Sequence, residues 1–178
     1  MIRLANLLGD RSGAAAVEMA LVTPLLLIML FGSVELGNYF YNEHKLVKAA
    51  RDGARYAARQ SFSTYSACSG EVPTRDVAGT VFEKTKLMVR KGTLDSTATD
   101  TLPNWASATF TVTMSCKTTL DNGSGGNYAL GGIYANTSAP TVVVNASLPY
   151  YPILGLPFGL SGLGASLNAS QSAAVAGL

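Results

Sequence analysis

The feature that most constrains this chain is a long apolar segment near its N-terminus, residues 14–34, whose only charged side chain is Glu18. A helix of this length spans about 31 Å, which matches the roughly 30 Å hydrocarbon core of a bilayer. A cleaved secretory signal has a shorter apolar region followed by a cleavage site of small residues, whereas this segment runs directly into the next part of the chain. It predicts a membrane-spanning helix that stays attached to the protein.

The residues after this segment continue the helical pattern into water. Apolar side chains recur at three- and four-residue spacing and form one stripe, which consists of Leu36, Phe40, Val47, Ala50, Ala54 and Ala57. Basic side chains lie off the stripe, at Lys45, Lys48, Arg51, Arg55 and Arg59. We therefore predict one helix from about residue 14 to residue 59. Pro24 removes an amide donor inside it, so a kink or a loosened turn is expected there.

The composition is that of an exported or envelope protein rather than a cytosolic enzyme. Of the 178 residues, 13% are charged, against about 25% in typical soluble domains, and 18 are glycine. The formal net charge of +2 is too small to indicate a nucleic-acid partner. Cys68 and Cys116 are what one disulfide in an oxidising compartment requires, and two buried free thiols are the alternative.

The basic residues and the cysteines favour opposite orientations in the membrane. Lys and Arg near a span normally mark its cytoplasmic side, and the five basic residues after the span outnumber Arg3 and Arg11 before it. Long domains, however, cross membranes largely regardless of charge, and a cysteine pair fits an oxidising space. We therefore predict a single-pass membrane protein whose C-terminal domain lies in an oxidising space outside the cytoplasm.

The rest of the chain predicts an α+β fold with a small antiparallel sheet. A second helix is expected from a cap at Thr74 to Gly92, with a buried face of Val77, Val81, Phe82, Met88 and Val89. Alternating apolar residues predict half-buried strands at 108–116, 141–149 and 166–176. A glycine-rich hairpin loop, residues 121–132, separates the first two strands.

An uncharged apolar loop with several prolines precedes the last strand, at residues 149–164. It is either a flap over the sheet or the long helix, or an exposed surface that docks on the bilayer or on another subunit. His44 is the only histidine, and the sequence has no catalytic triad, metal-ligand cluster or phosphate-binding glycine motif. We therefore expect no enzymatic activity, metal or cofactor.

The N-terminal end carries a more specific pattern. A short basic leader ends in Gly13, and Glu18 follows five residues later at the head of the apolar helix. This arrangement resembles a type IV prepilin, which implies that a membrane peptidase cuts between Gly13 and Ala14 on the cytoplasmic side. A carboxylate near the bilayer centre costs about 3 kcal/mol, and the new amine of a neighbouring subunit would offset part of that cost. Glu18 is therefore expected to set the register between subunits; the alternative is a carboxylate that snorkels to the interface.

The resemblance narrows to the TadE-like family, the minor pilins or pseudopilins of the Tad (tight adherence, Flp pilus) machinery. The matching positions cover about the first third of the chain: Gly13, Ala15, Ala16, Val17, Glu18, Pro24, Gly32, Glu35, Gly37, Ala49, Ala50, Arg51, Asp52, Gly53, Ala54, Arg55, Tyr56 and Ala57. Met19 departs from the Phe or Tyr that usually follows the glutamate in that family. The apolar loop before the last strand is also common there.

The segment around Gly53 has two interpretations. Arg51, Asp52 and Arg55 are spaced for contacts along one solvated helix face, each of a few tenths of a kcal/mol. The resemblance implies instead a packing surface against the domain or a partner pilin. We favour packing, because a glycine in a helix interior costs about 1 kcal/mol relative to alanine, and close approach of another backbone is a common reason for it.

These observations predict a leader (1–13), a transmembrane and extended helix (14–60) and a periplasmic α+β domain (61–178). The resemblance implies a minor pilin that a prepilin peptidase processes, with other minor pilins or the major pilin and the inner-membrane assembly platform as partners. Incorporation into an extracellular adhesion pilus is left open. The alternative is an uncleaved, membrane-anchored envelope domain that binds a ligand or surface through its apolar loop.

Overall fold

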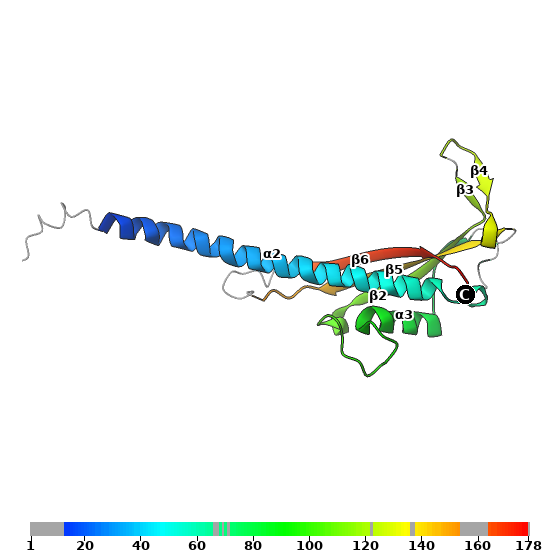
Figure 1. Cartoon of the computed structure of the whole chain (residues 1–178), viewed down its shortest axis with the longest axis horizontal. Helices are drawn as coiled ribbons and strands as arrows, with labels where there is room; N and C mark the ends of the chain where they lie inside the picture. Colours follow the sequence, from blue (N-terminus) through cyan, green and yellow to red (C-terminus); the bar gives the residue numbers. More distant parts are fainter. Residues whose placement is uncertain are drawn as a thin grey trace, which may run out of the picture.

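The computed structural model describes residues 13–65, 68, 70, 72–121, 123–135, 138–153 and 164–177. One long helix, α2 (Ala14–Ala58), leads into a small α+β domain, and its first part projects beyond that domain (Figure 1). The predicted fold class is confirmed. The helix begins and ends within a residue of the predicted limits and is unbroken at Pro24. Residues 1–12 of the predicted leader (1–13) and residues 154–163 of the predicted apolar loop (149–164) lie outside the described residues.

A four-stranded antiparallel sheet forms the centre of the domain, in the order β1-β2-β5-β6. Its strands are β1 (Val72–Asp76), β2 (Thr109–Lys117), β5 (Ala139–Pro149) and β6 (Ser166–Ala174). Side chains in β2 and β5 alternate between buried and partly exposed, because successive residues of a strand point to opposite faces. On the inner face Val112 pairs with Val144, and Met114 with Val142. The three predicted strands are therefore confirmed.

Two helices cover the inner face of this sheet. The second part of α2 packs against β5, β6 and the shorter helix α3 (Thr80–Lys91), and Figure 1 shows both helices along the sheet. Alanine dominates the buried side of α2, so its backbone lies close to its neighbours. The core residues that the helices contribute are Leu46, Ala50, Ala54, Ala57, Val81 and Val89.

The predicted start of the second helix is wrong. Thr74 does not cap a helix but lies in β1, which pairs with β2 at the edge of the sheet. Pro73 favours an extended residue before it and is tolerated on an edge strand because it has no amide to donate. The helix begins only after Gly79, whose φ of +75° suits glycine. Its end at Gly92, in the left-handed conformation, is as predicted.

The predicted apolar stripe of α2 is correct only in its second part. Leu36 and Phe40 are exposed, whereas Ala50, Ala54 and Ala57 are buried. Leu46, which lies outside the predicted stripe, is fully buried. Near Leu36 and Phe40, therefore, the domain covers a different face of α2 from the one that the apolar stripe predicted.

The connection between β2 and β5 is more ordered than the predicted loop. It contains a second, two-stranded sheet formed by β3 (Thr119–Asp121) and β4 (Asn127–Ala129), and this hairpin projects at the end of the domain far from the free part of α2 (Figure 1). Short 3-10 helices occur at η2 (Phe62–Tyr65), η3 (Trp105–Ser107) and η4 (Gly132–Tyr134). A disulfide joins Cys68, after η2, to Cys116 in β2, the pairing that the sequence predicted.

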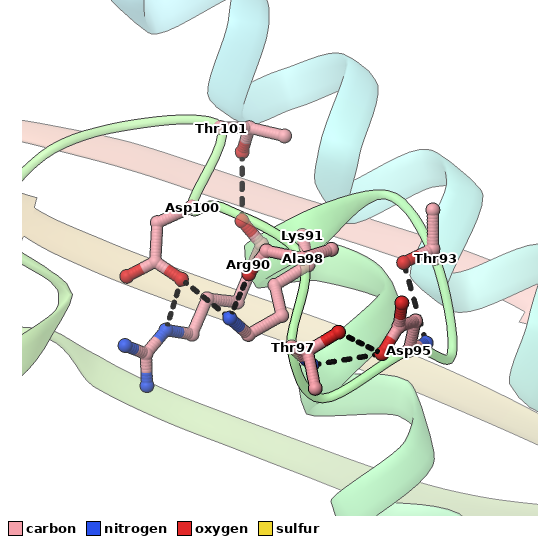
Figure 2. A network of polar contacts seen from close by, with 8 residues as sticks. All are labelled: Arg90, Lys91, Thr93, Asp95, Thr97, Ala98, Asp100 and Thr101. Atoms are coloured by element: carbon pink, nitrogen blue, oxygen red, sulfur yellow. Dashed lines mark hydrogen bonds and ion pairs between the residues drawn. The ribbon is translucent and has the colours of Figure 1, made fainter.

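A polar network holds the segment after α3 against that helix (Figure 2). The Asp100 carboxylate accepts a hydrogen bond of 2.6 Å from Arg90 Nε and lies 3.4 Å from Lys91 Nζ. Asp95 Oδ1 accepts from the backbone and hydroxyl of Thr97, at 2.8 and 2.7 Å. The bond from Arg90 is the largest cause that holds the pKa of the Asp100 carboxyl below its usual value.

Candidate functional site

The domain leaves the first part of α2 uncovered. From Ala14 to Leu30 every residue is exposed, including long aliphatic side chains such as Leu21, at 74% of its full accessible area. The helix is long and apolar enough to cross a membrane, and none of its most apolar part is buried in the domain. Exposed apolar surface of this extent marks a membrane or protein interface. The helix therefore fits a single-pass membrane protein.

The two residues of the predicted processing site lie at the beginning of this helix. Gly13 immediately precedes the first helical residue, Ala14. A Cβ atom added at Gly13 would meet nothing within 4 Å, and its φ of −82° is open to any residue. Neither packing nor backbone conformation among the described residues therefore requires glycine at this position.

Glu18 lies one turn into the helix with an exposed side chain. Its carboxylate makes no hydrogen bond or ion pair with any residue that the structure describes. Thr23, the next polar residue along the helix, donates instead to the carbonyl of Met19 in its own helix, at 2.6 Å. The two polar side chains of this surface thus differ: the threonine is satisfied internally, and the glutamate has its acceptor capacity available.

The helix α2 contains three glycines, and contacts among the described residues explain only one of them. A Cβ at Gly53 would lie 2.3 Å from Val89 Cγ2 of α3, a distance that real Cβ contacts do not show. Glycine is therefore required there for α2 and α3 to pack. At Gly32 and Gly37 an added Cβ would meet nothing within 4 Å. The cost of glycine in a helix is not offset at these two positions by contacts within the described chain.

The charged residues around Gly53 face water rather than the packing surface. Arg51 and Arg55 are exposed, and Asp52 is partly exposed. The Arg55 guanidinium lies 3.8 Å from the Asp52 carboxylate, one turn away in the same helix. The structure therefore divides the segment that the sequence treated as one surface: Gly53 packs against α3, and the two arginines remain available to a partner.

A second acid, Glu35, joins the projecting part of α2 to the domain. It is only 7% exposed. Its Oε1 accepts hydrogen bonds from the Tyr150 hydroxyl and, at 3.2 Å, from the backbone amide of Ile153. Asn38 donates to the same Tyr150 hydroxyl at 2.8 Å, and burial followed by the bond to Glu35 raises the pKa of Tyr150.

Sequence reasoning did not assign a role to Glu35. It appeared only as one matching position in the family pattern. A buried carboxylate needs bonded partners, but no local pattern shows that the domain buries this one. Tyr39 adds to the junction, since its ring packs edge-on against Tyr150 at 5.1 Å between centroids and its hydroxyl donates to the Ser166 carbonyl at 3.1 Å. The end of the apolar segment is therefore tied to the start of β6 and to the end of β5.

Comparison with known proteins supports one family. Residues 13–55 match the model of the family described as TadE-like protein. No curated protein and no solved structure matches the chain. The match begins at Gly13, includes Glu18, Glu35 and Gly53, and ends within α2. Residues 13–55 are a TadE-like segment, as the sequence pattern predicted.

Proposed function

We propose that this protein is a minor pilin, or pseudopilin, of a Tad/Flp-type pilus machinery. It is inserted in the inner membrane through residues 14–34, cut by a prepilin peptidase between Gly13 and Ala14, and acts in pilus assembly by packing, without a catalytic role. The observation that carries the proposal is the family match from Gly13, where the exposed apolar part of α2 begins. Its partners are other pilins and the inner-membrane assembly platform.

The role of Glu18 follows from its position in that helix. Its carboxylate has no partner among the described residues, and an unpaired carboxylate in hydrocarbon costs about 3 kcal/mol near the bilayer centre. Cleavage after Gly13 creates an amine on Ala14, so each processed subunit carries one new cation. A charge-assisted hydrogen bond between that amine and Glu18 of a neighbouring subunit would fix the register between the two helices.

The glycines of the exposed helix support close packing between subunits. Gly32 and Gly37 have open space on their Cα side, and small residues let two membrane helices approach until their backbones are in contact. Gly53, by contrast, is needed for packing within the domain, because a Cβ atom there would clash with Val89. We therefore assign intermolecular contacts to the first part of α2 and intramolecular contacts to the second.

The periplasmic orientation rests on the disulfide. Cys68 and Cys116 are joined, and disulfides persist in oxidising compartments such as the periplasm rather than in the cytosol. The basic residues of α2 favour the opposite orientation by count. We give the disulfide more weight, because the charge bias applies to short loops and long domains cross largely regardless of it.

Replacement of Glu18 tests the assembly role separately from insertion. Glu18→Ala should leave the amount of membrane-inserted protein unchanged, because removing a charge makes the helix easier to insert, whereas co-purification with partner pilins should fall. Thr23→Ala is the matched control, since its hydroxyl bonds only its own helix and its loss should leave both quantities unchanged. If Glu18→Ala retains normal partner recovery, the register role of Glu18 is wrong.

A further inference from the structure

A group of exposed apolar and aromatic side chains lies where α2 enters the domain. It consists of Leu36, Phe40 and Tyr41 from the helix and Tyr151 and Ile153 from the chain after β5, and we call these five residues the collar. Each is exposed by about half or more of its accessible area, from 49% for Phe40 to 68% for Ile153. A soluble domain has no need of such a cluster on its surface.

The helix sets the height of the collar relative to a bilayer. If Ala14 lies at one boundary of the hydrocarbon core, a rise of 1.5 Å per residue brings Glu35 to the other boundary, about 31 Å away. Residues 36–41 then lie within about the next 9 Å, which is the interfacial and headgroup region of the bilayer. The helical part of the collar is therefore placed at the membrane surface by the length of the span alone.

The domain brings the other two collar residues to the same height. The Ile153 amide donates to Glu35 Oε1 at 3.2 Å, and the Tyr150 hydroxyl donates to the same oxygen. The Tyr39 ring packs against that of Tyr150 at 5.1 Å. Ile153, which is bonded to Glu35, and its neighbour Tyr151 therefore stay beside the start of the soluble part of α2.

The chemistry of the collar matches the bilayer interface. Tyrosine is enriched where a membrane meets water, because its ring is apolar and its hydroxyl is polar. No charged residue occurs between Glu35 and Glu43. The first cation beyond the collar, Lys45, is exposed and lies over the Tyr41 ring at 4.6 Å from its centroid. A lysine in this position extends toward anionic headgroups, which basic residues near a membrane surface attract.

We infer that the collar docks on the phospholipid interface of the periplasmic leaflet and holds the domain in one orientation above the membrane. The inference rests on the proposed membrane insertion of residues 14–34. The bilayer is favoured over a second subunit because the collar continues directly from the lipid-facing side chains of the span, of which Val34 is 53% exposed. Docking also keeps water from the bonded carboxylate of Glu35.

Single-tryptophan reporters test this in the full chain. Trp105 is the only tryptophan, so Trp105→Phe removes the tryptophan fluorescence of the wild-type chain. Its Nε1 is buried without a hydrogen-bond partner among the described residues, so this substitution breaks no hydrogen bond with them. Ile153→Trp and Tyr151→Trp report on the collar. Leu120→Trp, 55% exposed on the distant β3–β4 hairpin, is the matched control, and Leu26→Trp, 56% exposed, reports on the span.

Each variant is reconstituted, at a dilution that leaves single copies, in vesicles of phosphatidylcholine and phosphatidylglycerol with brominated acyl chains. We expect bromine near the headgroups to quench most of the Ile153→Trp and Tyr151→Trp emission and to leave Leu120→Trp unchanged. Leu26→Trp should be quenched by bromine at mid-chain. Absence of thiol alkylation without reductant shows that the Cys68–Cys116 disulfide has formed in each variant, and resistance of the domain to limited proteolysis shows that it is folded.

The outcomes separate the collar from the proposed function. Quenching of Leu26→Trp without quenching of either collar reporter overturns the docking and leaves the membrane helix intact. If no reporter is quenched, membrane insertion fails, and the proposed function fails with it. If the collar reporters are shielded only at high protein density, a second copy rather than lipid covers the collar, which also overturns the inference.

Discussion

Replacing Gly53 with alanine should destabilise the domain although alanine is the better helix former. A Cβ at this position would lie 2.3 Å from Val89 Cγ2, whereas carbon atoms in contact prefer about 3.5–4.0 Å. Val89 is fully buried, and its β-branched side chain has one strongly preferred rotamer in a helix. The two helices must therefore separate, or Val89 must leave its rotamer.

The expected effect is the difference of two terms. Overpacking a core typically destabilises a protein by about 1–3 kcal/mol, whereas replacing a glycine with alanine inside a helix stabilises it by about 1 kcal/mol. The net loss of stability for Gly53→Ala is therefore about 1 kcal/mol. For a domain of this size that corresponds to a fall of about 4 °C in Tm.

The measurement is urea unfolding of the detergent-solubilised full chain, followed by the emission of Trp105, which is the only tryptophan and is 6% exposed. Gly37→Ala is the control in the same helix, since its Cβ would meet nothing within 4 Å and should not lower stability. Combining Gly53→Ala with Val89→Ala should cost less than the sum of the single changes. A Gly53→Ala variant as stable as the wild type would refute the packing argument.

Three further results are expected. The folded-state pKa of Asp100 is lowered, chiefly by Arg90, so its stabilisation of the fold is present above the unfolded pKa of about 3.9 and is lost as pH falls through the folded pKa. Asp100→Asn should therefore lower the free energy of unfolding by about 0.5 kcal/mol at pH 7, measured by denaturant titration. This difference should shrink below about pH 4. Glu35→Ala should speed exchange of the Ile153 amide about tenfold in hydrogen-exchange mass spectrometry, since a lost buried bond costs about 1–3 kcal/mol, and an unchanged rate would contradict the junction. Cys68 and Cys116 should resist alkylation in intact cells without reductant, and full labelling would contradict the periplasmic orientation.

Local sequence patterns predicted the parts of the fold that local forces determine. The apolar run and the helical spacing after it gave α2 to within a residue at each end, because length and periodicity are properties of neighbouring residues. Strict alternation predicted β2 and β5 for the same reason. Gly92 ended α3 as expected, since its left-handed conformation suits glycine.

The parts that were missed depend on contacts between distant residues. β1 has five residues, contains Pro73 and shows a register shift against β2, so its sequence has no alternating pattern that predicts a strand. Thr74 also resembles a helix cap. The bond between Glu35 and Tyr150 joins residues 115 positions apart. The exposed Leu36 and Phe40 are explained by where the domain covers α2, which the helix sequence alone does not encode.

The predicted site divides in the same way. Gly13, Ala14 and Glu18 came from a short spacing pattern, and the structure places them together at the free end of α2. Gly53 was singled out by its cost in a helix, and the contact with Val89 supplies the physical reason. Arg51 and Arg55 were grouped with it by sequence position, but they point to solvent.

The N-terminal mass of the protein purified from cells with a working Tad system tests the central claim most directly. The account predicts a mature chain that begins at Ala14, and a Gly13→Val variant that stays membrane-bound and retains residues 1–13. The variant separates processing from folding, because a Cβ atom at position 13 meets none of the described residues within 4 Å. A wild-type protein that still begins at Met1 would contradict the minor-pilin account and favour an uncleaved, membrane-anchored binding domain.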